Sequence, residues 1–111
     1  MFLLLVSELK EKLDLEYKNQ AKDCEITDCY IGDMLSVVMS NAPEGAAWLT
    51  VQTNINITAV SVLVGIACII VVEGQEPDLN TVLKAKEQNV NILKTEKSAY
   101  QLAVEISRLL S

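Results

Sequence analysis

Residues 45–72 form the longest uncharged segment of this 111-residue chain, and that segment limits what the chain can fold into. Residues 55–72 are apolar enough to suggest a membrane helix, since about eighteen apolar residues already make a candidate span. The nearest basic residues, however, are Lys22 upstream and Lys84 downstream, so no basic flank could anchor or orient such a span. We therefore expect the segment to form the interior of a water-soluble domain that does not contact the membrane.

The pattern within this segment changes at Gly65. Before it, apolar residues recur at helical spacing in the sequence NINITAVSVLV. After it, the sequence IACIIVV is rich in β-branched residues and has no helical period, which is typical of a strand buried on both faces. The pattern predicts a helix over residues 54–64, a stop at Gly65 and a strand over residues 66–73.

The rest of the chain also alternates between helical and strand patterns. The expected elements are helix 8–13, strand 13–18, strand 25–31, helix 34–42, strand 46–53, helix 54–64, strand 66–73, helix 79–89, strand 90–95 and helix 98–110. Ser7 and Asp33 are the expected N-caps of the first two helices. Because strands and helices alternate from residue 46 onward, we expect parallel strands joined by right-handed crossovers. The sequence predicts a single three-layer α/β domain over residues 1–111, a mostly parallel sheet with helices on both faces.

Charge and composition argue against several classes of function. Nine basic and fifteen acidic residues give a net charge of −6, which disfavours nucleic acid and anionic membranes as partners. The chain has no His and no glycine-rich phosphate loop, so we expect no catalytic residue, no cofactor and no metal ion. Three cysteines, an odd count, and the lack of a secretory leader in residues 1–13 predict a cytoplasmic protein.

An acidic cluster could in principle hold a hard cation. Its members are Asp23, Glu25, Asp28 and Asp33. Carboxylates are the ligands that Mg²⁺ and Ca²⁺ prefer, but the spacing matches no calcium-binding loop. A solvated strand edge and a helix cap explain these residues better.

Polar residues follow the predicted parallel strands at their carboxyl ends. Ligands of open parallel sheets bind beyond these ends. The candidate ligand-binding residues are Thr53, Asn54, Asn56, Glu73, Gly74 and Thr95. They could form hydrogen bonds to a small ligand or to a facing subunit. The structural alternative is that Asn54 and Thr95 only cap the helices that follow them.

The order of the elements and several local sequences resemble the DRTGG domain, a small α/β module related to the N-terminal domain of HPr kinase/phosphorylase. The matching stretches are EITDCYIGDMLSVVM, AAWLTVQTNINITAVSVLVGIACIIVVEG and VNILKTEKSAYQLAVEI, and with the opening SELKEKLDLEY they cover nearly the whole chain. The signature itself differs. The family's Asp-Arg pair falls near Asn54 and Ile55 here, and its Thr-Gly-Gly falls near residues 72–74, of which only Gly74 is retained.

The resemblance implies a stand-alone cytosolic module that self-associates. It also implies that the module is not catalytic, since catalysis in the larger proteins that carry this domain lies in other domains. Our first hypothesis is therefore a non-catalytic regulatory or scaffolding protein, a homodimer that binds a further, unknown protein partner. Met34, Val38 and Trp48 are the expected contributors to the dimer surface. The alternative is a sensor that binds a nucleotide or acyl phosphate at the strand ends. An enzyme in its own right is the third possibility.

Overall fold

The computed structural model describes residues 3–111, and it divides the uncharged segment into a helix and a strand. Helix α3 spans Asn56–Val64 and strand β4 spans Cys68–Val71. Gly65 has a φ of 81°, the left-handed conformation that commonly ends helices and that glycine adopts without a steric penalty. The predicted stop at Gly65 is confirmed. Within residues 3–111, no helix is both long and apolar enough to cross a membrane.

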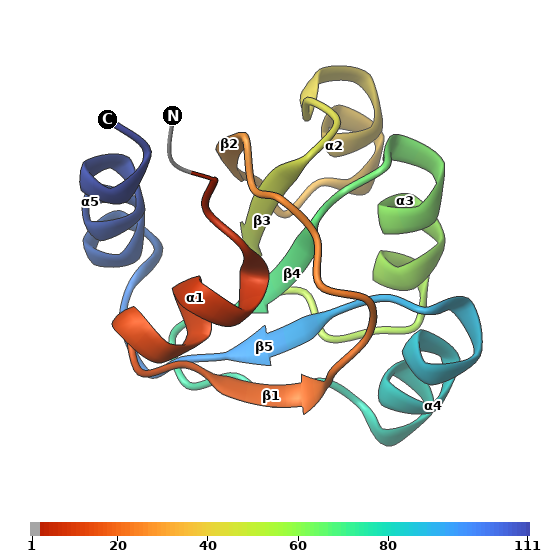
Figure 1. Cartoon of the computed structure of the whole chain (residues 1–111). Coiled ribbons are helices and arrows are strands. Elements are labelled where there is room, and N and C mark those ends of the chain that lie inside the picture. The colour runs from red at the N-terminus through yellow and green to blue at the C-terminus, as the bar shows by residue number, and fades with distance from the viewer. Residues whose placement is uncertain (1–2) are drawn as a thin grey trace.

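Five strands form one sheet in the order β1-β5-β4-β3-β2 (Figure 1). The strands besides β4 are β1 (Glu16–Asn19), β2 (Asp28–Ile31), β3 (Ala46–Thr50) and β5 (Ile92–Lys94). Strands β2 to β5 run parallel to their neighbours, whereas the edge strand β1 pairs antiparallel with β5. The predicted mostly parallel sheet is confirmed.

Helices cover both faces of this sheet (Figure 1). Helices α1 (Val6–Lys12) and α5 (Ala99–Leu110) lie on one face, and α2 (Leu35–Asn41), α3 and α4 (Leu79–Gln88) lie on the other. This arrangement is the three-layer α/β architecture that the sequence predicts, in a single domain.

Alternate residues of the central strands contribute to two cores, one on each face of the sheet. Leu49 and Ile70 are fully buried beneath α1 and α5. Trp48 and Ile69 are fully buried beneath α2, α3 and α4. Burial on both faces explains why β3 and β4 are continuous apolar sequences rather than alternating ones.

The two predicted N-caps are wrong. Ser7 lies inside α1, whose N-cap is Leu5, and the Ser7 amide donates a hydrogen bond of 3.0 Å to Asp23 Oδ1. Helix α2 has Met34 at its N-cap position, so Asp33 lies one residue too early to cap it. The Ser7 hydroxyl instead donates a hydrogen bond to Asp23, and Asp33 Oδ1 accepts bonds from the Thr50 hydroxyl and the Val51 amide. These partners are distant in sequence, so local patterns do not reveal them.

The expected dimer surface needs a related correction. Val38 and Trp48 are fully buried in the core beneath the helices, so neither can contact a second molecule. Met34 is 67% exposed and remains available. The error arises because an apolar residue on a short helix or strand can face either the core or solvent, and only the packed structure decides which.

Candidate functional site at the carboxyl ends of the strands

Asp33 fastens the loop after β2 to the carboxyl end of β3. Its Oδ1 atom accepts hydrogen bonds of 2.9 Å from Thr50 Oγ1 and 2.9 Å from the Val51 amide. Gln52 Nε2 donates a further bond of 2.9 Å to the Asp33 carbonyl. Asp33 therefore holds the chain in place beyond the carboxyl ends of β2 and β3. The sequence pattern misses this role because the pairing of β2 with β3 brings together residues far apart in the chain.

The first three candidate residues lie just beyond β3, and their polar groups bind the protein itself. The Thr53 carbonyl accepts hydrogen bonds from the Asp78 amide at 3.0 Å and from Thr81 Oγ1 at 2.8 Å. Asn54 Oδ1 accepts a bond of 2.9 Å from the amide of Asn56, the first residue of α3. Asn54 thus satisfies the amide of the first helical residue, although the N-cap position of α3 is Ile55 and Asn54 lies one residue before it. The Asn56 side chain is exposed.

The other three candidates lie together where β4 and β5 end. The Glu73 amide donates a hydrogen bond of 2.9 Å to the Lys97 carbonyl, and the Gly74 amide donates one of 3.0 Å to the Thr95 carbonyl. Glu73 has a φ of 62°, an uncommon conformation for a residue other than glycine. Gly74 has a φ of +70°, and a Cβ atom there would lie 2.7 Å from Glu96 Oε1, so glycine fits this position best.

Thr95 does not cap the helix that follows it. Its Oγ1 atom accepts a hydrogen bond of 3.2 Å from the Lys97 amide within the loop. Helix α5 is capped by Ser98 instead, whose Oγ atom accepts a bond of 3.1 Å from the Gln101 amide. The candidate residues therefore form two groups, Thr53 with Asn54 and Asn56, and Glu73 with Gly74 and Thr95. The loop that contains Asp78 connects the two groups.

Thr95 also lines a cavity of about 250 Å³ at the edge of the sheet. Its other lining residues are Asp14, Glu16, Lys94, Glu96 and Lys97. Both cations of this cavity are already paired. Lys94 Nζ lies 3.3 Å from a Glu96 oxygen, and Lys97 Nζ lies 3.0 Å from Glu105 and donates a bond of 3.1 Å to the Leu13 carbonyl. A phosphate bound here would have to compete with these carboxylates.

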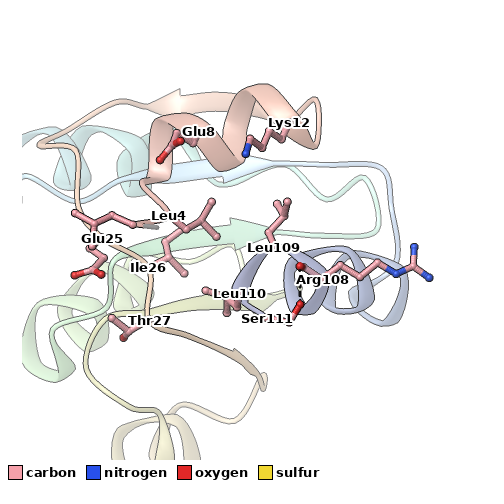
Figure 2. A pocket seen from close by; sticks show the side chains of 11 residues that line it. Leu4, Glu8, Lys12, Glu25, Ile26, Thr27, Arg108, Leu109, Leu110 and Ser111 are labelled. Carbon is pink, nitrogen blue, oxygen red and sulfur yellow. Dashed lines mark hydrogen bonds between the residues drawn. The ribbon is translucent and has the colours of Figure 1, made fainter. Parts of the chain in front are cut away.

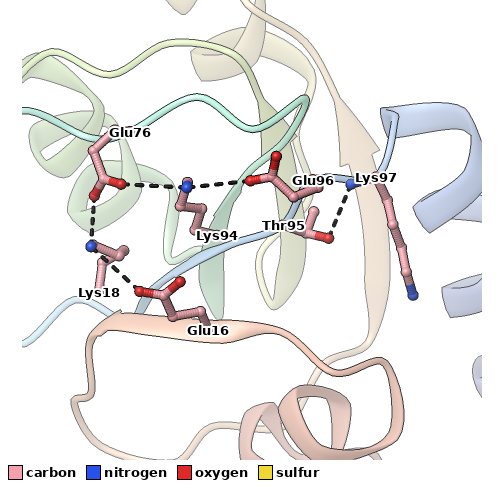
Figure 3. Close-up of polar contacts among 7 residues, drawn as sticks. All are labelled: Glu16, Lys18, Glu76, Lys94, Thr95, Glu96 and Lys97. Atoms are coloured by element: carbon pink, nitrogen blue, oxygen red, sulfur yellow. Dashed lines mark hydrogen bonds and ion pairs between the residues drawn. The ribbon is translucent and has the colours of Figure 1, made fainter.

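A chain of ion pairs extends from this cavity across the surface (Figure 3). Glu76 bridges two lysines, with Lys18 Nζ at 2.6 Å and Lys94 Nζ at 3.4 Å. The hydrogen bond from Lys18 lowers the pKa of Glu76 below its ordinary value. Hydrogen bonds to Glu96 and Glu76 raise the pKa of Lys94. The pairs hold β1, β5 and the loop after β4 together, which is a structural role.

A larger cavity of about 640 Å³ lies between α1, residues 25–27 and the end of α5 (Figure 2). Leu4, Ile26 and Leu109 form part of its apolar wall. The other lining residues are Leu3, Glu8, Lys12, Glu25, Thr27, Arg108, Leu110 and Ser111. No local motif marks this cavity, because its walls combine residues near both ends of the chain with residues 25–27.

The cysteines and acidic residues offer no metal centre among residues 3–111, where no group of three or more potential ligands has a suitable arrangement. Burial raises the pKa of the Cys29 thiol to about 11, and burial also raises the pKa of Cys68. Both thiols therefore stay protonated near neutral pH, a state in which they are weak nucleophiles.

The fold of this chain has a likeness among solved structures. No family model matches the chain, and no curated protein sequence is similar to it. The structure is similar, with a TM-score of 0.70 and 17% sequence identity, to the CBS and DRTGG domains of the regulatory region of Clostridium perfringens pyrophosphatase, solved with its activator diadenosine tetraphosphate. The match covers 95% of this chain but only 45% of that one. It shows that the two share a fold, and it agrees with the DRTGG-like element order in the sequence.

Proposed function

We propose that this chain is a non-catalytic regulatory or scaffolding module that acts by binding protein, including a second copy of itself. The proposal treats the chain as a divergent, cytoplasmic member of the DRTGG family. The shared fold with a regulatory region supports a regulatory role. The three cysteines are free thiols, which suits a reducing compartment.

The observation that carries the proposal is the character of helix α3. This helix has no charged residue, and it is apolar on its outer side as well as on its inner side. Its inner residues Ile57 and Val60 are buried against the sheet, whereas Val62 is 52% and Leu63 is 72% exposed. A helix that is apolar on all sides normally has both sides covered. Within residues 3–111 nothing covers the outer side of α3, so a protein partner is the natural means of burying it.

Sedimentation velocity on the purified chain at several concentrations tests this proposal. We expect reversible association that increases with concentration in the micromolar range. Affinity capture from the native cell extract, comparing the wild type with Leu63→Glu, tests binding to a different protein. A monomer at every concentration, together with no protein retained by the wild type in preference to the variant, would contradict the proposal.

The second candidate function is a sensor of a nucleotide or acyl phosphate at the carboxyl ends of the strands. Two features favour it: the cavity beside Thr95 contains two lysines, and the similar regulatory region was solved with a nucleotide activator. The surrounding carboxylates oppose an anion, so this candidate ranks below protein binding. Calorimetric titration with diadenosine tetraphosphate, ATP and acetyl phosphate tests it. Binding that is lost in Lys97→Met would support it, and no heat with any of the three would exclude this group of ligands.

A further inference from the structure

We propose that α3 pairs with the α3 helix of a second copy of this chain, in an antiparallel arrangement with Ala59 near the twofold axis. This inference rests on the function proposed above and identifies the surface and the partner. It comes from the spacing of the exposed apolar residues, the area that they offer and the distribution of charge.

The outer side of α3 carries an apolar stripe formed by Ile55, Ala59, Val62 and Leu63. These positions follow the i, i+4, i+7 and i+8 spacing of one helix face, and all four residues are exposed. The smallest of them, Ala59, lies at the centre, with a larger residue about one turn to each side. A small central residue lets two helices approach closely. An interface between identical copies must be self-complementary, and an antiparallel pair places Ile55 of each copy beside Leu63 of the other.

A groove between α3 and α4 extends this surface. Its volume is about 380 Å³. The lining residues are Thr58, Ala59, Val62, Leu63, Lys84 and Gln88. Leu79 and Leu83 project from α4 on the side opposite its buried residues Thr81 and Ala85, and they are 76% and 55% exposed. The α3 wall of the groove is therefore mostly apolar, whereas Lys84 and Gln88 form its α4 wall.

The exposed area is sufficient for a modest dimer. Five large apolar side chains are exposed on the outer sides of α3 and α4, namely Ile55, Val62, Leu63, Leu79 and Leu83. If a fully exposed side chain is taken to offer about 100 Å², their exposed fractions add up to roughly 300 Å² of apolar area per copy. A standard interface buries about 800 Å² per partner, of which a little over half is apolar. The available area is about two-thirds of that apolar share, which predicts a dimer that forms in the micromolar range rather than a permanent one.

The distribution of charge favours a second copy on this face. The whole chain carries a net charge of −6, so two copies repel each other over most of their surfaces. The charged residues of α2, α3 and α4 are Lys84, Lys86 and Glu87, which is two positive charges and one negative, or a net +1. The helices of this layer therefore contribute only one negative charge per copy, Glu87, to a contact between two copies. Because an interface of this kind has few ion pairs, added salt should screen the repulsion elsewhere and strengthen the dimer.

Sedimentation velocity of matched variants tests the interface. We expect Leu63→Glu and Ala59→Glu to raise the dimer dissociation constant at least about tenfold, because each places two carboxylates in an apolar contact. Tyr100→Glu is the matched control, since Tyr100 is 78% exposed on α5, on the opposite face of the sheet, and its change should leave the constant unaltered. Circular dichroism and thermal melts of each variant establish that it is folded.

Cross-linking gives a second measurement that does not depend on destabilising the dimer. In a background with Cys24→Ser and Cys29→Ser, we expect Ala59→Cys to form a disulfide-linked dimer under mild oxidation, and Tyr100→Cys to form none. If the wild type dimerises but the α3 variants dimerise equally well, the interface is elsewhere and this inference fails while the proposed function stands. If salt weakens the dimer, or if the wild type is a monomer that binds only a different protein, the pairing of α3 with α3 is likewise wrong. A wild type that binds neither itself nor another protein removes the proposed function as well.

Discussion

Trp48 Nε1 donates a hydrogen bond of 2.8 Å to the carbonyl oxygen of Gly32. The indole ring is fully buried in the core beneath α2, α3 and α4, whereas Gly32 is the residue at which the chain leaves β2. This bond satisfies a carbonyl that has left the regular sheet and ties the edge strand β2 to the centre of the domain. A single side chain thus fills the core and satisfies a backbone group.

We expect Trp48→Phe to destabilise the fold by about 2–4 kcal/mol, because it removes this bond, leaves a carbonyl unpaired and creates a cavity. Urea unfolding followed by circular dichroism measures the change. Tyr100→Phe is the control, since the exposed Tyr100 should change stability by less than about 0.5 kcal/mol. Equal stability of the two variants would show that the Gly32 contact contributes nothing.

Gly65 ends α3 with a φ of 81°, and the separation of helix from strand depends on this residue. We expect Gly65→Ala to cost about 1–2 kcal/mol, the penalty of a left-handed conformation for a residue with a Cβ atom. Gly65→Asn should cost less, since Asn adopts this conformation more readily, as Asn89 does at the end of α4. A Cβ atom at Gly65 would lie 3.0 Å from Cγ of Glu44, an exposed and flexible side chain that can move aside in both variants. Thermal melts decide the order, and an Ala variant as stable as the Asn variant would contradict this reasoning.

The three thiols should react in a fixed order in the native protein. Cys24 is partly exposed, whereas burial raises the pKa of Cys29 to about 11 and also raises that of the fully buried Cys68. Because the thiolate is the reactive form, we expect iodoacetamide near neutral pH to modify Cys24 first, Cys29 slowly and Cys68 only after unfolding. Mass spectrometry of peptides at timed intervals measures this order. Early labelling of Cys68 would show that the core opens far more often than its packing implies.

The same thiols predict that the stability of the fold decreases at alkaline pH. Their pKa values are raised in the folded state above the ordinary value of 9.0, so above pH 9.0 the unfolded chain loses protons that the folded chain retains. The contribution of these two thiols to stability should therefore be constant below pH 9.0 and fall as the pH rises toward about 11. The double variant Cys29→Ala and Cys68→Ala should show a shallower fall than the wild type in urea unfolding. If the free energy of unfolding falls equally with pH in the wild type and the double variant, groups other than these thiols cause the fall.

Glu76 links Lys18 of β1 to Lys94 of β5, and its pKa is lowered from an ordinary value of 4.5 by the hydrogen bond from Lys18. A lowered pKa of a carboxyl group contributes stability above pH 4.5 that is lost as the pH falls below it. We expect Glu76→Gln to reduce stability slightly at neutral pH and low salt, and to flatten the acid side of the stability curve. The difference should vanish near 1 M salt, where the Debye length is about 3 Å. A difference that persists at high salt would point to packing rather than charge.

The local pattern of the chain predicts most of the secondary structure correctly but leaves the candidate site largely unresolved. The Gly65 stop, the buried strands and the alternation of strand and helix depend on neighbouring residues, and these predictions are confirmed. The six predicted ligand-binding residues fall into two groups whose polar atoms mostly bind the protein itself. Their role in ligand binding stays a prediction. Asp33 and the cavity between the chain ends had no local signal, because their partners are distant in the sequence.

The sequence alone determined that the uncharged segment would divide into a helix and a strand rather than form one helix, because the shift from helical spacing to β-branched residues at Gly65 is a property of consecutive residues. Only the tertiary structure decided that β1 and β2, consecutive in the chain, lie at opposite edges of the sheet. It also decided that Trp48 faces the core while Leu63 faces solvent. Strand order and side-chain direction follow from which distant apolar surfaces bury each other, and that free energy belongs to the whole packed chain rather than to any one segment.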